Sequence, residues 1–194
     1  MILKAQKTEW QDSADYDIGD AVPFQLTGTV AQDYNDYKGA YQLVFHDTLS
    51  NGLTFNASSV KVYVNDSDTP VATNQYTITY PATDNHSFDV TIHDVKSLGT
   101  DVSKVRVEYT ATLNENAIIG SLGNPNKMYM EFSNNPNNEQ GGETGKTPED
   151  TVIVFTYKVS VNKVNENNEK LDGAEFTLEK KLRETQMYGN QLLK

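Results

Sequence analysis

The feature that most constrains the fold of this chain is the repeated alternation of apolar and polar residues with a period of two. The clearest case is residues 104–113 (KVRVEYTATL), in which every second residue is apolar or aromatic. This alternation is typical of a β-strand with one face in a core and the other in solvent. Comparable segments occur at 21–30, 41–47, 60–64, 76–80, 87–92, 127–132 and 150–164. Turn residues separate them, so the pattern predicts an all-β fold, an antiparallel β-sandwich.

Helical signals are weak, with room for one short turn at residues 94–98 and another at 116–121. Residues 133–148 (SNNPNNEQGGETGKTP) contain almost no apolar side chain that could be buried. Because a strong strand pattern follows at once, we expect this stretch to be a long exposed loop within a domain.

Charge and composition exclude several classes of function. The chain has 16 Lys and Arg against 27 Asp and Glu, a net charge of −11, which disfavours binding to nucleic acids and to anionic membranes. Cysteine is absent, so disulfides, thiol catalysis and thiolate metal sites are excluded. No apolar run approaches the roughly 20 residues that span a bilayer. We therefore predict no membrane span and no nucleic-acid partner.

The domain boundary is predicted within the last alternating segment. This segment, 150–164, could close one domain and open the next without a flexible linker. We place the domains at 1–158 and 159–194. The second is too short for a complete sandwich, and is interpreted as the first strands of a further β-sandwich domain.

Motifs along the chain resemble one family. Residues 14–24 (ADYDIGDAVPF), 45–53 (FHDTLSNGL) and 123–136 (GNPNKMYMEFSNNP) resemble, in order, the second domain of Gram-positive sortase-assembled pilin backbones. Residues 161–164 (VNKV) and 171–178 (LDGAEFTL) resemble the start of the next domain. The resemblance implies an immunoglobulin-like sandwich of the collagen-adhesin A-type, followed by the beginning of a B-type domain.

The same resemblance implies a function outside the cell. It points to a structural shaft subunit of a pilus on the cell surface, attached to the cell wall, whose partners are other pilin subunits joined by a sortase. The alternative is a surface adhesin domain that binds a host matrix protein or glycan, because one fold can carry either role. The expectation is a structural protein rather than an enzyme, and no cofactor is expected.

Domains of this family commonly carry a self-made amide bond between a Lys and an Asn side chain, promoted by a nearby Asp or Glu. The reaction needs a neutral amine and a protonated carboxyl, and burial favours both uncharged forms. The motifs place the lysine on the first strand, at Lys4 with Lys7 as the alternative. They place the acid at Asp47 and the amide at Asn126, with Asn124 as the alternative. Lys163 would be the matching nucleophile of the second domain, and we expect it to stay unbonded here.

A metal site is not predicted. The three histidines, His46, His86 and His93, are scattered along the chain, and their spacing does not match a known metal-ligand motif.

Overall fold

A computed structural model of the protein describes residues 1–3, 9–82, 85–173 and 175–177. The chain divides into two compact units, Met1–Tyr157 and Lys158–Lys194. All of the named secondary-structure elements lie in the first unit.

In its described residues, the first unit consists of β-strands joined by turns and three short 3₁₀ helices. The strands are β1 (Ile2–Leu3), β2 (Trp10–Gln11), β3 (Ser13–Asp15), β4 (Ala21–Thr29), β5 (Leu43–Leu49), β6 (Leu53–Val64), β7 (Tyr76–Thr79), β8 (Phe88–Ile92), β9 (Lys104–Leu113), β10 (Asn124–Ser133), β11 (Thr144–Lys146) and β12 (Asp150–Phe155). The helices are η1 (Tyr34–Asp36), η2 (Thr73–Gln75) and η3 (Val95–Leu98). The last of these is the turn predicted at 94–98, and Asp94 caps it by accepting from the Lys96 amide.

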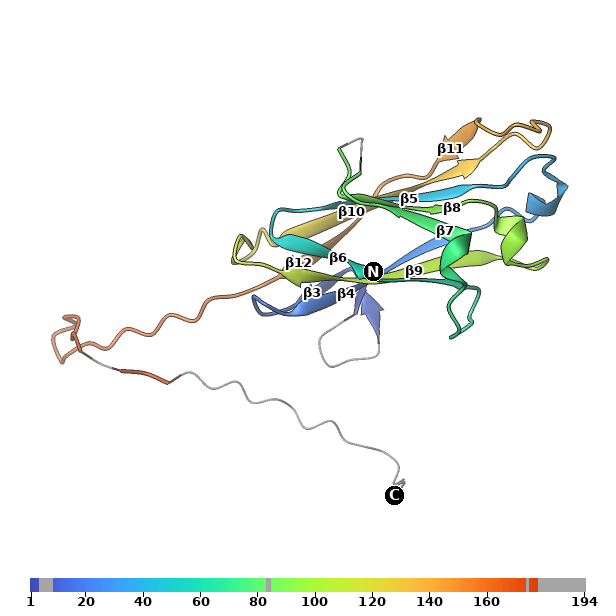
Figure 1. Cartoon of the computed structure of the whole chain (residues 1–194). Helices are drawn as coiled ribbons and strands as arrows, with labels where there is room; N and C mark the ends of the chain where they lie inside the picture. Colours follow the sequence, from blue (N-terminus) through green and yellow to red (C-terminus); the bar gives the residue numbers. More distant parts are fainter. Residues whose placement is uncertain (4–8, 83–84, 174, 178–194) are drawn as a thin grey trace, which may run out of the picture. The chain divides into compact units, whose positions relative to one another are not determined.

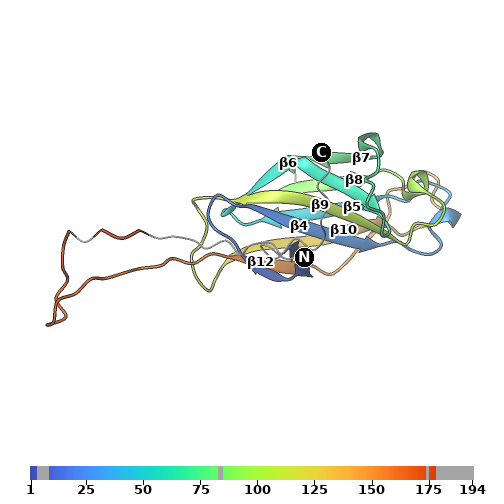
Figure 2. The same cartoon turned by 90° about the horizontal axis from the view of Figure 1, so that it is seen from below.

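The strands form two sheets that pack face to face, as Figures 1 and 2 show from two directions. One sheet has the order β2-β1-β4-β9-β6, and the other has the order β3-β12-β10-β5-β8-β7, with β11 added beside β10. The pairings are antiparallel except that of β12 with β3, which is parallel. The two-sheet, strand-dominated architecture agrees with the predicted sandwich.

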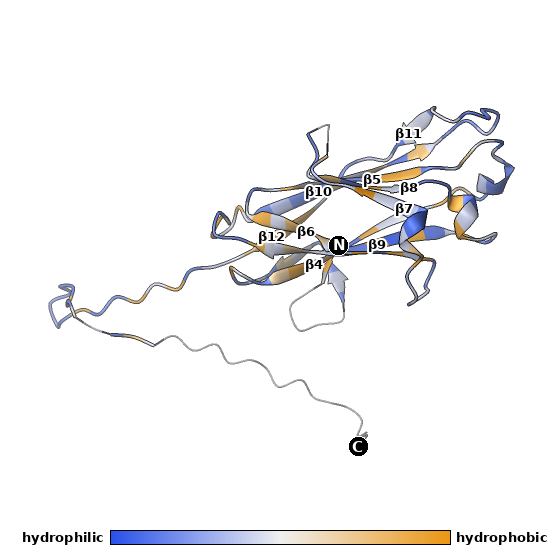
Figure 3. Ribbon diagram, viewed as in Figure 1, coloured by the Kyte–Doolittle hydropathy of each residue, from blue (hydrophilic) through white to orange (hydrophobic). Residues whose placement is uncertain are grey.

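Strict alternation builds the core between the sheets. Along β9 every second residue is buried, from Val105 to Leu113. On β5, Leu43, Phe45 and Asp47 point inward while the residues between them are less buried. The same alternation is visible as changes of colour along the strands in Figure 3. The facing rows of β4, β5, β8 and β9 therefore supply most of the fully buried side chains.

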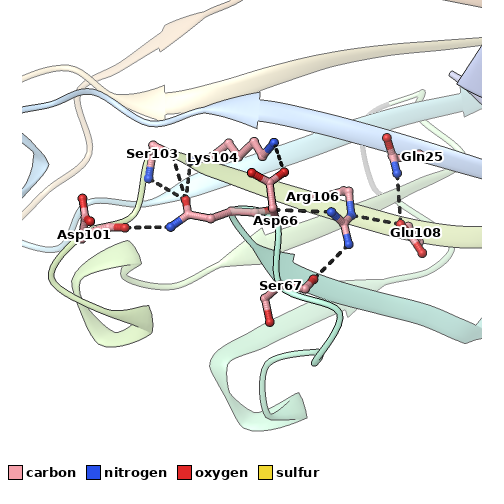
Figure 4. A network of polar contacts seen from close by, with 9 residues as sticks. Gln25, Asp66, Ser67, Asp101, Ser103, Lys104, Arg106 and Glu108 are labelled. Carbon is pink, nitrogen blue, oxygen red and sulfur yellow. Dashed lines mark hydrogen bonds and ion pairs between the residues drawn. The ribbon is translucent and has the colours of Figure 1, made fainter.

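A polar network on the outer surface fixes the turn that follows β6 (Figure 4). Asn65 adopts a left-handed backbone conformation with φ of 53°. Its side-chain oxygen accepts from the amides of Ser103 and Lys104 at 2.9 and 3.2 Å. Arg106 on β9 donates to the carbonyl of Ser67 and pairs with Glu108 at 3.0 Å. These contacts tie the turn to the middle of the sheet.

The final strand is shorter than the alternation suggested. The expected strand 150–164 ends at Phe155. Its ladder with β10 stops where Asn124 pairs with Val154, because β10 begins there. Beyond Phe155 the pattern continues in the sequence, but residues 157–163 are exposed. An alternating pattern makes a strand only where a neighbouring strand offers backbone partners.

The stretch 133–148 also differs from the expected loop. Part of it, β11, pairs with β10 through Phe132 opposite Gly145 and Glu131 opposite Lys146. A Cβ at Gly145 would come within 2.8 Å of the Phe132 ring, so glycine lets the aromatic ring cover this strand. Residues 116–121, where a helical turn was possible, form turns without a helix.

In the second unit, the described residues form a small turn closed by one bridge between Val164 and Lys170. The side chains described around it are mostly exposed.

Candidate cross-linking site

Two of the residues predicted for the cross-link meet inside the sandwich. Asp47 on β5 is completely buried, and Asn126 on β10 is 2 % exposed. In the antiparallel pairing of these strands, Asn126 lies opposite Leu49 and Asp47 lies opposite Met128. The two polar residues are therefore diagonal neighbours on the inward face of one sheet, within reach of each other.

A third polar group reaches them from the opposite sheet. Tyr109 on β9 is buried, and its hydroxyl donates to Oδ2 of Asp47 at 3.0 Å. The amide nitrogen of Asn126 donates to the Tyr109 oxygen at 2.7 Å and to Asp47 Oδ2 at 3.3 Å. Each of the three groups thus contacts the other two, and together they bridge the two sheets.

Aromatic rings surround this polar triangle. The ring of Tyr109 stacks on Phe24 at 5.2 Å and meets Phe55 and Phe88 edge-on at 5.6 and 4.9 Å. Because this environment is apolar, burial raises the pKa of the Asp47 carboxyl to about 7, although hydrogen bonds from Tyr109 and Asn126 oppose the rise. Burial, with the nearby Asp47 carboxylate, raises the pKa of Tyr109 well above its usual value. The site therefore keeps a large fraction of this carboxyl protonated at pH values up to about 7.

Two buried acceptors at this site have no hydrogen-bond partner among the described residues. They are Oδ1 of Asp47 and Oδ1 of Asn126. Leaving a buried polar atom unpaired costs about 1–3 kcal/mol. A protonated carboxyl or an additional amine at this position would satisfy them, so the triangle has the chemistry of a site that accepts one more donor.

Asn124, the alternative amide, is also fully buried but has different partners. Its side-chain oxygen accepts from the Ile118 amide at 2.8 Å. Its nitrogen donates to the carbonyls of Ile118 and Val154 at 3.1 and 3.2 Å. All of these partners are backbone groups, so Asn124 braces the 118–123 turn against β12.

Of the three lysines named from the sequence, Lys4 and Lys7 lie outside the described residues. Ile2, two residues before Lys4, is completely buried on β1 and pairs with Phe24. In the second unit, Lys163 is exposed, and its backbone carbonyl accepts from the Leu171 amide.

Sequence reasoning missed two groups. Tyr109 was not predicted, although it is the one residue with a polar group in the inward-facing row of residues 105–113. The histidines are less scattered than their spacing suggested, because His46 and His86 lie together beside Asp89 on the outer face of the same sheet as Asp47. The spacing of these residues along the sequence does not indicate the cluster, because it is the pairing of β5 with β8 that brings His46 beside Asp89.

Comparison with known proteins identifies the family. A family model described as the Gram-positive pilin backbone subunit 2, Cna-B-like domain, matches residues 18–136, more than half of the chain. The chain belongs to this family. This match confirms the resemblance seen in the motifs. The backbone subunits of Gram-positive pili are structural proteins and not enzymes. The description carries the B-type name, however, where the motifs resembled the A-type.

Individual pilins show the same relationship. The trypsin-resistant surface T6 protein of Streptococcus pyogenes serotype M6 is 29 % identical over 139 residues, which cover 61 % of this chain and 25 % of that protein. The solved T6 backbone pilin has a TM-score of 0.56 at 24 % identity, covering 79 % of this chain and 35 % of its own. A 35 kDa C-terminal fragment of the major pilin GBS80 of Streptococcus agalactiae has a TM-score of 0.63 at 20 % identity, covering 82 % of this chain and 57 % of the fragment.

These matches confirm the all-β sandwich fold of the pilin backbone. The chain spans about a quarter of the length of the curated pilin and about a third of the solved T6 chain. In the described residues, no helix is long and apolar enough to cross a membrane.

Proposed function

We propose that the chain is a shaft domain of a surface pilus, stabilised by an amide bond that it forms between the side chains of Lys4 and Asn126. The observation that carries the proposal is the buried contact of Asn126 with Asp47 and Tyr109. Two of the similar proteins, a backbone pilin and a major pilin, support the same role. The shaft would stand outside the cell, anchored at the cell wall, with other pilin subunits as partners through a sortase.

Lys4 is favoured over Lys7 as the nucleophile. An extended chain turns every second side chain to the same face, and Lys4 is two residues beyond the buried Ile2. Ile2 pairs with Phe24, whose ring stacks on Tyr109. A continued strand would therefore bring the Lys4 amine toward the triangle, whereas Lys7 has the opposite parity.

The proposed reaction has one bond formed and one broken. The neutral amine of Lys4 attacks Cγ of Asn126, the Nζ–Cγ bond forms, the Cγ–Nδ2 bond breaks, and ammonia leaves. The Asp47 carboxyl, kept protonated by burial, donates a hydrogen bond to the amide oxygen and passes a proton from the attacking amine to the departing nitrogen. Oδ1 of Asn126, which has no hydrogen-bond partner among the described residues, is the atom that would receive this bond.

The intact mass of the purified chain tests this proposal. A completed bond makes the chain lighter by one ammonia than its sequence requires, and peptide mapping would show a branched peptide that joins Lys4 to Asn126. Because a succinimide at Asn51-Gly52 would lose the same ammonia, the mass alone is not sufficient. Asn126→Ala should abolish the loss, whereas a succinimide would persist in that variant.

Matched variants separate the roles of the residues. Asp47→Ala should also prevent the loss of ammonia, while Asn116→Ala, a change at an exposed turn, should leave it complete. Lys4→Ala and Lys7→Ala should differ, and only the first should abolish the bond. A full sequence mass in the unmodified chain would contradict the proposed cross-link.

Binding to a host matrix has less support. In the stretch 133–148 the one basic residue is Lys146, and its ammonium lies 3.4 Å from Glu131. A cleft of about 650 Å³ between the sheets is lined largely by apolar and hydroxyl side chains of β4 and β10, with Asp150 as its one charged side chain. The aromatic side chains of Tyr41 and Phe132 line this cleft, but none of its described lining residues is basic, so it offers a ligand no cationic side chain.

A further inference from the structure

The outer face of the β5-containing sheet carries a row of polar and aromatic side chains that the cross-link does not use. His46 on β5 lies directly opposite Asp89 on β8 and directly opposite Tyr129 on β10. His86, three residues before Asp89, lies in the segment that leads into β8. Directly opposed residues in a sheet have their Cβ atoms about 5 Å apart, so these side chains meet.

Both imidazoles turn a nitrogen toward one carboxylate oxygen. Nδ1 of His46 lies 2.7 Å from Oδ1 of Asp89, and Nδ1 of His86 lies 3.7 Å from the same oxygen. One ligand atom from each residue lies within 4.8 Å of the other two. With bonds of about 2.0–2.1 Å, two ligands of a tetrahedral zinc ion are about 3.3 Å apart. The two measured separations lie on either side of that value.

The second nitrogen of each ring faces a neighbour that can orient it. Nε2 of His86 lies 3.2 Å from the Tyr129 hydroxyl, and Nε2 of His46 lies 3.7 Å from Oε2 of Glu131. The Tyr129 ring also stacks on His46 with centroids 4.6 Å apart. Metal-bound histidines almost always have such a partner on the other nitrogen, because it fixes the ring and its tautomer.

Two buried ring nitrogens have no hydrogen-bond partner in the described structure: Nε2 of His46 and Nδ1 of His86. A neutral His46 that donates from Nδ1 to Asp89 presents an unprotonated Nε2 to Glu131. A metal ion bound at Nδ1 would require that single proton to move to Nε2, which faces Glu131. The same ion would occupy Nδ1 of His86. One cation bound by both rings therefore accounts for both of the unpaired nitrogens.

We propose that His46, His86 and Asp89 form a binding site for one divalent transition-metal ion of the zinc type. Nδ1 of each imidazole and one carboxylate oxygen of Asp89 are the protein ligands, and water completes the coordination. Imidazole with a carboxylate suits zinc and its neighbours better than calcium or magnesium, which prefer oxygen ligands. The side chains of His46, His86 and Asp89 are 14, 17 and 15 % exposed, so the cluster lies near the surface and not in the core. A bound ion would fasten β5 to the segment that precedes β8.

Calorimetric titration with zinc chloride tests the proposal, on a tag-free chain freed of metal with a chelator. We expect one ion per chain. His86→Gln and Asp89→Asn should each weaken binding at least tenfold, and Glu131→Gln should weaken it about 10- to 100-fold, as the loss of an outer partner does. His93→Gln is the matched control, because His93 is exposed and bonds Thr77 away from the cluster, and it should bind zinc as the unmodified chain does.

Unfolding and spectroscopy provide independent readouts. Zinc at about 100 times the dissociation constant should raise the ratio of folded to unfolded chain about 100-fold, but not in His86→Gln. Cobalt substituted for zinc should give the visible absorption of a low-coordinate site. Unchanged affinity in His86→Gln and Asp89→Asn, equal weakening in His93→Gln, or an absence of binding would each overturn the site. Because the cluster is on the outer face of the sheet, this result is independent of the mass test for the cross-link.

Discussion

At the scale of single residues, the protonation of Asp47 links the site to stability. Its pKa is about 7 in the folded chain and near 3.8 when exposed, so the folded state holds the proton more tightly. The stability that this contributes is present below about pH 4 and is lost as the pH rises toward 7. The comparison needs chains that cannot cross-link, for which Lys4→Ala/Lys7→Ala serves as background. We expect the free energy of unfolding of this background chain to fall between pH 4 and 7, when it is compared with that of the background chain that also carries Asp47→Asn. A difference that is independent of pH would contradict a raised pKa.

Tyr109 provides a second prediction at this scale. In Tyr109→Phe the ring keeps its stacking on Phe24, but Asp47 Oδ2 loses the hydroxyl that donates to it at 3.0 Å. We expect a loss of about 1–3 kcal/mol in the non-cross-linking background, measured by urea unfolding. In the otherwise unmodified chain, mass spectrometry after refolding should show slower loss of ammonia. Tyr63→Phe, on the outer side of β6 beside Arg106, is the control and should change the rate little.

At the scale of strands and turns, the sequence predicted what depends on local alternation. The strand at residues 104–113 was predicted correctly because β9 pairs with β4 on one side and β6 on the other, and its inward row is buried in the core. The end of β12 was not predicted correctly, because it depends on where the neighbouring strand β10 begins. β11 was missed since its pairing depends on Gly145 under Phe132, and not on apolar content. The pair Asp47 and Asn126 was found through motif resemblance, whereas Tyr109 and the His46 cluster arise from contacts between distant strands.

The brace formed by Asn124 gives a prediction for these elements. Asn124→Ala would leave the amide and carbonyl of Ile118 and the carbonyl of Val154 without their partner. We expect a loss of about 1–3 kcal/mol in unfolding free energy and faster hydrogen exchange in β12 and the 118–123 turn. Asn116→Ala should leave both unchanged. The cross-link should still form in Asn124→Ala, and its disappearance would favour Asn124 as the reacting amide.

At the scale of the whole domain, the proposed bond determines how the sandwich carries tension. Force on the ends enters near β1 and leaves through β12, which is held by β10 and β3. A bond from Lys4 to Asn126 closes the 123 residues from Lys4 to Asn126 (126 − 4 + 1) into a loop that force cannot extend. By analogy with disulfides, such closure also contributes on the order of 5 kcal/mol.

Single-molecule pulling on the first unit would measure this directly. The cross-linked chain should release β12, β11 and the part of β10 that follows Asn126, and then stop, because only the residues outside the loop can extend. Asp47→Ala should lengthen further by roughly 400 Å, since an extended residue spans about 3.3–3.6 Å. Asn116→Ala should behave as the unmodified chain. If the unmodified chain releases the full length of residues 1–157, the first and last parts of the sandwich are not covalently joined, and the shaft depends on packing alone.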